Sequence, residues 1–256
     1  MKATPLLLAA AILLLPANEA PWGQTGHRVV GEVAADHLDR PARRAVNRVL
    51  GDTSLAIAST WMDEIKSDSA YNHTHDWHWV TIPEGMTYAQ TEKNPNGDLV
   101  GTLERLITEL KGGGLSVRQE SEHLKMLIHL MGDLHQPLHV GTGEDQGGNQ
   151  VKVEWFYEPT NLHRVWDTHM IDDSKLSYTE LTRAVNHPSR QEIRSWQEGT
   201  VRDWAHEAME LRGEVYDLPA DSSLGYRYDY ENWDLLQRQL LKAGVRLAGV
   251  LNEIYG

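Results

Sequence analysis

A histidine-rich segment in the middle of the chain places the strongest constraint on its fold. Four side chains that can bind metal ions fall within residues 129–139, HLMGDLHQPLH, and the residues around them are apolar. His129 and Asp133 are four residues apart, so on a helix they lie on the same face. Pro137 lacks an amide proton and disfavours helix at the preceding residue, so the helix should end or kink there. The helix could therefore serve one metal ion, and the turn that carries His139 could serve another.

The alternative is a helix whose buried histidines are simply satisfied by hydrogen bonds. A second pair, His163 and Asp167, repeats the four-residue spacing and favours metal binding. The chain contains no Cys, so any zinc must be held by His and carboxylate side chains. Such nitrogen and oxygen ligands suit zinc best, with manganese and iron as alternatives. There are more of them than one tetrahedral ion uses, and clustered ions about 3.5–4 Å apart commonly cleave phosphate esters.

The remaining sequence predicts one mainly α-helical domain with at most a small β-hairpin. Apolar residues recur at helical spacing, and Ser116 with Gln119 forms a capping box before the central helix. Residues 151–157 alternate and predict a strand, whereas the aromatic residues and histidines of 71–80 predict an extended loop. The predicted helices cover residues 28–38, 41–50, 59–66, 98–110, about 117–136, a segment that opens with residues 161–167, and several segments within 176–256.

The start of the chain predicts an export signal. Lys2 precedes an apolar run over residues 6–15, which is shorter than the roughly 20 residues of a transmembrane helix. We expect residues 1–21 to be a signal peptide and processing region, residues 22–256 to be the functional domain, and the protein to be secreted or periplasmic. The net charge of −13 argues against a basic groove for duplex DNA.

Six short motifs resemble the S1/P1 nucleases, secreted zinc enzymes whose fold is shared with bacterial zinc phospholipases C. The motifs occur in the order of that family and span residues 22–167, more than half of the chain. They are Trp22-Gly-x3-His27, Trp61-x-Asp63-Glu-Ile, Trp77-His78-Trp79, His129-x2-Gly-Asp133-x2-Gln-Pro-Leu-His139, Gly147-Gly-Asn149 and Asn161-Leu-His163-x2-Trp-Asp167.

The resemblance implies three Zn²⁺ ions and a water between two of them that attacks phosphorus in line. Asp63, Lys66 and Asp133 would be catalytic, and Asp133 would serve two ions. The first ion would be held by Asp63, His78, His129 and Asp133, the second by His139, His163 and Asp167, and the third by the amine and carbonyl of Trp22 with His27 and Asp133. Only a first residue has a free amine. The chain must then be cut after Pro21, although a cut after Ala20 fits the cleavage rule better.

The resemblance also places Lys66, Trp79 and Asn149 at the substrate. Lys66 stands where many family members carry a charge-stabilising arginine, and lysine keeps the charge without the bidentate fork. Trp79 stands where the family has an aromatic that stacks on a base and so selects single strands. The alternatives are a solvated charge for Lys66 and wall packing for Trp79. Thr81 replaces a carboxylate that contacts the base edge in some members, so base preference is not predicted. His135, beside the ligands, should support them without binding metal.

We therefore expect a monomeric zinc phosphodiesterase that hydrolyses single-stranded DNA and RNA, acts on 3′-nucleotides and has no stable membrane association. One alternative is a zinc-dependent phospholipase C, against which Trp79 and Asp167 argue, because phospholipases of this fold carry Glu at the latter position. The other is a non-catalytic periplasmic metal-binding protein. A ligand shared between two ions, as proposed for Asp133, suits an open hydrolytic centre better than a metal store.

Overall fold

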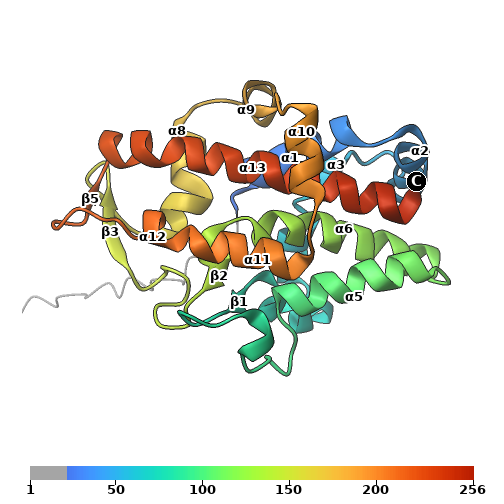
Figure 1. Cartoon of the computed structure of the whole chain (residues 1–256), viewed down its shortest axis with the longest axis horizontal. Coiled ribbons are helices and arrows are strands. Elements are labelled where there is room, and N and C mark those ends of the chain that lie inside the picture. Colours follow the sequence, from blue (N-terminus) through green and yellow to red (C-terminus); the bar gives the residue numbers. More distant parts are fainter. Residues whose placement is uncertain (1–21) are drawn as a thin grey trace, which may run out of the picture.

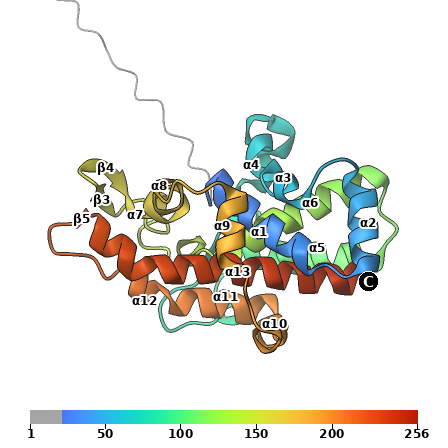
Figure 2. The same cartoon turned by 90° about the horizontal axis from the view of Figure 1, so that it is seen from above.

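The longest helix, α13 (Tyr226–Tyr255), runs along most of the molecule in both views of the computed structural model (Figures 1 and 2). Helices α1, α2, α6 and α10 pack against it. The structure describes residues 22–256, so the predicted signal segment at residues 1–21 lies outside the described residues. The mainly α-helical fold predicted from the sequence is confirmed. Within the described residues, none of the helices is long and apolar enough to span a bilayer.

The helices that surround α13 are mostly short. They are α1 (Gln24–His37), α2 (Arg40–Leu50), α3 (Leu55–Ala58), α4 (Trp61–Glu64), α5 (Leu99–Gly112), α6 (Val117–Leu134), α7 (Leu162–Arg164), α8 (Met170–Asp173), α9 (Tyr178–Val185), α10 (Arg190–Gln197), α11 (Val201–Glu210) and α12 (Arg212–Val215). The 3₁₀ turns are η1 (Ile65–Ser67), η2 (Ser69–His78), η3 (Tyr88–Gln90) and η4 (Pro137–His139), and η5 (Val165–His169) is a π-helical turn.

Helix α6 carries the histidine-rich segment through the core. It begins with the predicted capping box, in which the Ser116 hydroxyl accepts a hydrogen bond from the Gln119 amide. Every residue from 126 to 140 is buried, so the polar side chains of this stretch are enclosed together with its apolar ones. The helix ends at Leu134 and η4 begins at Pro137, so the helix breaks close to the point that the proline predicts. Buried polar groups require partners, so this end of α6 must be matched by other segments.

Two small sheets complete the fold. Strand β1 (Val80–Thr81) pairs in parallel with β2 (Val140–Gly141), with Val80 opposite Val140. Strands β3 (Lys152–Trp155) and β4 (Glu158–Asn161) form the predicted hairpin, and β5 (Ser223–Leu224) lies parallel to β3. Strands of two residues show no alternation, which is why the sequence did not predict β1, β2 or β5.

The prediction of an extended loop over residues 71–80 was wrong. Most of this stretch is the 3₁₀ helix η2, and extended backbone begins only at Trp79. Asp68 starts η2 by accepting a hydrogen bond from the Ala70 amide, and Tyr71 packs edge-on against Trp61 with ring centroids 5.5 Å apart. Successive 3₁₀ turns follow neither the helical nor the strand period, so periodicity could not identify them.

Candidate active site

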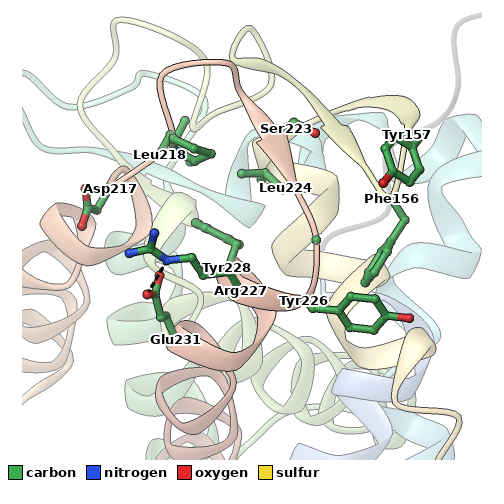
Figure 3. Close-up of a pocket in the computed structure, with 12 residues that line it drawn as sticks. Phe156, Tyr157, Asp217, Leu218, Ser223, Leu224, Tyr226, Arg227, Tyr228 and Glu231 are labelled. Carbon is green, nitrogen blue, oxygen red and sulfur yellow. Dashed lines mark hydrogen bonds and ion pairs between the residues drawn. The ribbon is translucent and has the colours of Figure 1, made fainter.

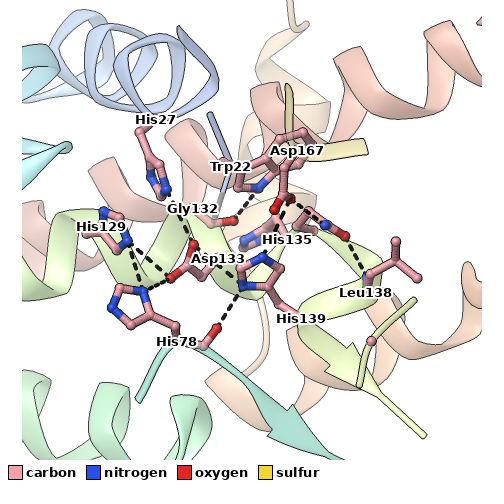
Figure 4. Close-up of polar contacts among 12 residues, drawn as sticks. Trp22, His27, His78, His129, Gly132, Asp133, His135, Leu138, His139 and Asp167 are labelled. Carbon is pink, nitrogen blue, oxygen red and sulfur yellow. Dashed lines mark hydrogen bonds and ion pairs between the residues drawn. The ribbon is translucent and has the colours of Figure 1, made fainter. Parts of the chain in front are cut away.

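Three groups of His and Asp side chains converge at the end of α6. Figure 4 shows most of these side chains. Within each group the ligand atoms lie within 4.8 Å of one another, close enough for a single ion. The groups are His27, His129 and Asp133; Asp63, His78 and His129; and His139, His163 and Asp167. Every His and Asp that the sequence predicted as a ligand falls in one of them. Segments from α1 to η5 contribute, so the fold assembles the site from side chains spread over residues 27–167.

Three of the histidines are oriented by backbone carbonyl groups. A carbonyl oxygen only accepts, so the Nδ1 atom that contacts it must carry the proton, and Nε2 of the neutral ring is left as an electron-pair donor for a metal. These contacts join His129 to Ser59 O (2.7 Å), His139 to His78 O (2.8 Å) and His163 to Gly147 O (2.7 Å).

Asp133 lies at the centre of the first two groups and has no exposed surface. Its Oδ2 is 2.9 Å from His78 Nδ1 and 3.3 Å from His129 Nε2. Its Oδ1 is 3.4 Å from His27 Nε2 and 3.6 Å from His139 Nδ1, the ring nitrogen that donates to His78 O. One carboxylate oxygen therefore faces His78 and His129 and the other faces His27, which is the arrangement a ligand shared by two ions requires.

Unsatisfied polar atoms at the site fit bound metal ions. Burying such atoms without a partner costs about 1–3 kcal/mol each, so a cluster of them calls for a ligand. Nitrogen and carboxylate oxygen donors without sulfur are a suitable set for zinc. Atoms without a hydrogen-bond partner among the described residues include both ring nitrogens of His27, Asp63 Oδ2, His78 Nε2, Asp133 Oδ1 and His139 Nε2.

The charge states of the buried groups also suit metal binding. Burial lowers the pKa of His27, and it lowers the pKa of His78 to about 3, so both rings are neutral at pH 7. Burial alone would raise the pKa of Asp133, but His129 and His139 hold it well below its usual range. His129 is the exception: burial opposes its protonation, but the carboxylates of Asp133 and Asp63 raise its pKa, so a metal ion must displace a proton from this ring more often than from the other two. Neutral imidazole and ionised carboxylate are the forms that bind metal.

The N-terminal segment is held between two of the groups. The fully buried indole of Trp22 donates from Nε1 to Gly132 O at 2.8 Å, and the amide of Gly23 donates to Asp167 O at 2.6 Å. A Cβ atom on Gly132 would lie 2.9 Å from His27 Nδ1, so the glycine lets the His27 ring approach α6. The structure thus brings Trp22 to the site, and the ligand role of its amine stays a prediction because residue 21 is not described.

A cleft of about 920 Å³ opens beside the ligands and is lined by Lys66, Trp79 and Asn149. Lys66 Nζ lies 2.6 Å from Asp63 Oδ1 with only 23% of its side chain exposed, so it is not simply a solvated charge. The ring of Trp79 is 38% exposed and is therefore not fully packed into the wall. Asn149 donates from Nδ2 to Gln146 O at 3.1 Å, while its buried Oδ1 has no hydrogen-bond partner in residues 22–256.

Two polar residues beside the ligands behave in ways that the sequence did not reveal. Gln136 donates from Nε2 to Asp167 Oδ1 at 2.6 Å, and the only signal in the sequence was its presence in the motif that carries His129, Asp133 and His139. His135 does not support the ligands as expected. Its Nδ1 donates to Met131 O at 2.8 Å and its Nε2 accepts from Arg246 at 3.0 Å, so both ring nitrogens are used away from the site.

A second cavity, of about 410 Å³, lies where the β3–β4 turn meets the start of α13 (Figure 3). Phe156, Leu224 and Tyr226 are among its lining residues, and Tyr157 at its rim is 84% exposed. Among the described residues, no group of metal-binding side chains lies in this cavity. The candidate active site is therefore the cleft beside α6.

Comparison with known proteins finds similar nucleases over nearly the whole chain. The chain is 29% identical over 261 residues to Endonuclease 3 of Arabidopsis thaliana, covering 91% of this chain and 89% of that protein. It is 26% identical over 289 residues to Nuclease S1 of Aspergillus oryzae, covering 97% of each. It is 25% identical over 277 residues to Nuclease P1 of Penicillium citrinum, covering 92% of this chain and 98% of that protein.

The family model for S1/P1 Nuclease matches residues 22–256, a range that includes every residue of the three ligand groups. The match extends well beyond the motifs at residues 22–167 that suggested the resemblance, into the C-terminal helices that pack behind α6. The chain therefore belongs to the S1/P1 nuclease family and is a hydrolase that acts on phosphoric ester bonds.

Proposed function

We propose that this nuclease is a secreted enzyme with three zinc ions that hydrolyses single-stranded DNA and RNA and also acts on 3′-nucleotides. The observation that carries the proposal is the placement of Asp133, whose two carboxylate oxygens face different sets of histidines. Zinc ions held by the three groups would polarise a phosphoryl oxygen and lower the pKa of a bound water to near neutrality.

The side chains of the cleft would bind and orient the substrate. The protein carries a net charge of −13, so attraction for a phosphate must be local. Lys66 lies next to Asp63 and supplies a positive charge on the cleft side of the ligands. The partly exposed ring of Trp79 offers a face on which an unpaired base can stack. Bases of a duplex are already stacked and paired, so this contact favours single strands.

The substrate class can be tested by measuring hydrolysis of single-stranded DNA, the matching duplex, a 3′-nucleotide and phosphatidylcholine side by side. We expect rapid hydrolysis of the single strand and the 3′-nucleotide, slower hydrolysis of the duplex and none of the lipid. Hydrolysis of phosphatidylcholine alone would instead identify a phospholipase C. Zinc binding without any hydrolysis would identify a metal-binding protein.

Zinc content tests the metal centre independently of activity. Elemental analysis of the exported protein should give close to three zinc ions per chain, and a value near one would contradict the trinuclear centre. Removing zinc with a chelator should abolish hydrolysis and lower the melting temperature, because metal that binds only the folded form stabilises it.

The amine of Trp22 can bind zinc only after cleavage behind Pro21 frees it, because an amide nitrogen within the chain has no available lone pair. N-terminal sequencing and the intact mass of the exported protein should show Trp22 as the first residue. A protein that begins at Pro21 and still binds three zinc ions with full activity would exclude the amine as a ligand. A cytoplasmic form that retains Met1 should lack the third ion and most of the activity.

A further inference from the structure

Gln136 lies between two turns that carry ligands of one group, and none of its surface is exposed. Its amide uses both of its polar ends. Nε2 donates to Asp167 Oδ1 at 2.6 Å, and Oε1 accepts from the Leu138 amide at 2.6 Å. The first contact reaches η5 and the second closes η4, the turn that ends with His139. One side chain therefore connects the two segments that supply His139 and Asp167.

The carboxylate of Asp167 needs such a partner to keep its orientation. Its Oδ2 lies 2.8 Å from His163 Nε2, whereas its Oδ1 lies 3.6 Å from His139 Nε2. Burial opposes ionisation of Asp167, but His163 and His139 lower its pKa, so the buried carboxylate is charged. A neutral amide donor can hold one oxygen of this carboxylate in place without competing with the histidines for its charge.

The position of Asp167 in the chain makes side-chain support more important. It lies in η5, a single π-helical turn, rather than in a long regular helix. Its backbone carbonyl is held by the Gly23 amide, but that contact does not determine the rotation of the carboxylate. Within the described residues, the contact from Gln136 is the shortest hydrogen bond to the Asp167 carboxylate that comes from a residue outside the three ligand groups.

We propose that Gln136 is a positioning residue that sets the zinc affinity of the group formed by His139, His163 and Asp167. The inference rests on the proposed zinc centre but concerns one of its three groups. Hydrogen-bond partners of metal ligands commonly change metal affinity by about 10–100-fold when they are removed. Loss of the Gln136 amide should therefore weaken the binding of one zinc ion and leave the affinities for the other two unchanged.

The test compares Gln136→Met with Gln239→Met. Gln239 is also buried, and it donates from Nε2 to His135 O at 2.9 Å, one residue before Gln136. Both variants lose a buried amide in the same neighbourhood, but only the first loses a contact to a ligand. Zinc is titrated into each metal-free protein against a chromophoric chelator, and the melting temperature of each metal-free protein is measured alongside.

We expect Gln136→Met to bind one of three zinc ions about 10–100-fold more weakly, while Gln239→Met binds all three as the unmodified protein does. Both should lower the melting temperature of the metal-free form to a similar extent. Gln136→Asn, which keeps an amide but is one methylene shorter, should show the same single-site loss and serves if the methionine variant does not fold.

Equal zinc affinities in the unmodified protein and both Gln136 variants would overturn the inference. So would an equal loss in Gln239→Met, because it would attribute the effect to general destabilisation. Fewer than three ions in the unmodified protein would contradict the proposed centre instead. The titration uses no nucleic acid, so it is separate from any result on nuclease activity.

Discussion

The three groups of metal-binding side chains form what we call the floor of the cleft, and Lys66 and Trp79 belong to its wall. These two regions are held in different ways. On the floor, His129 and Asp133 have no exposed surface, and each is bonded to groups far away in the sequence. On the wall, Trp79 and Lys66 are partly exposed, with 38% and 23% of their side chains accessible. The floor is therefore organised by folding itself, whereas on the proposed function the exposed surface of the wall is contacted by substrate. Substitutions in the two regions should separate effects on the metal centre from effects on substrate binding.

The largest effect is expected for Asp133→Ala on the floor. It removes the carboxylate that faces two sets of histidines, so at least two ligand groups are disrupted. We expect hydrolysis of single-stranded DNA to fall on the order of 1,000-fold or more, equivalent to about 4 kcal/mol of transition-state stabilisation. Zinc content should fall with it.

The matched control is His73→Ala. His73 is an exposed histidine of η2 whose ring contacts Ala70 O, and it belongs to none of the ligand groups. It should keep full activity and zinc content. Similar activities in the two variants would show that the shared carboxylate has been assigned to the wrong residue.

Acid should destabilise the metal-free floor. The pKa of His78 is about 3 in the folded protein and near 6.5 in the unfolded chain, so between these values only the unfolded state takes up the proton. Titration of His78 therefore leaves the free energy of unfolding unchanged above pH 6.5 and lowers it as the pH falls from 6.5 toward 3. His27 acts in the same direction, and His129, whose raised pKa favours the folded state below pH 6.5, offsets part of the loss. Melting temperatures of metal-free protein at pH 7 and pH 5 measure this, and equal values would contradict it.

A smaller effect is expected where the wall meets the floor, at Lys66. Lys66→Met removes the cation beside Asp63 while keeping most of the side-chain volume. A hydrogen bond to a charged group contributes about 1.5–3 kcal/mol, so kcat should fall roughly 10–100-fold with zinc content unchanged. Lys66→Arg keeps the charge and should retain most of the activity. If Lys66→Met lost zinc instead, the residue would act through Asp63 and not through the substrate.

The smallest effect is expected at Trp79, on the wall alone. Stacking on an aromatic ring contributes about 1–3 kcal/mol per base, so Trp79→Ala should raise KM for single-stranded DNA about tenfold. Zinc content and melting temperature should hardly change. Tyr157→Ala is the control, because that tyrosine is more exposed but lies at the second cavity. An unchanged KM for Trp79→Ala would assign the tryptophan to packing.

The sequence predicted the floor better than the wall. The spacing of His129 and Asp133 and the break before Pro137 identified α6, its end and its polar face, because helical periodicity and proline geometry act locally. The same local rules missed η2, whose turns follow no simple period. They also could not pair His78 with Asp133, which are 55 residues apart in the chain and meet only after folding.

Other features of the site depend on a single contact that no pattern records. Gln136 was visible only as one position of a family motif, and its proposed role follows from one hydrogen bond to Asp167, 31 residues later. His135 was expected to support the ligands because it lies next to them in the sequence. It turns instead toward Arg246 of α13, since neighbours at the end of a helix point in different directions.

The short pairing of β1 with β2 has a consequence for where the enzyme cuts. Trp79 directly precedes Val80, His139 directly precedes Val140, and the two valines are paired in register. The Trp79 carbonyl also accepts a hydrogen bond from the Leu99 amide, which ties the same point to α5. These contacts fix the position of Trp79, the proposed stacking surface, relative to the turn that carries His139. On the proposed function, the fold would set the distance from a stacked base to the bond that is broken, so we expect each cleavage at a constant offset from that base, whatever the length of the strand.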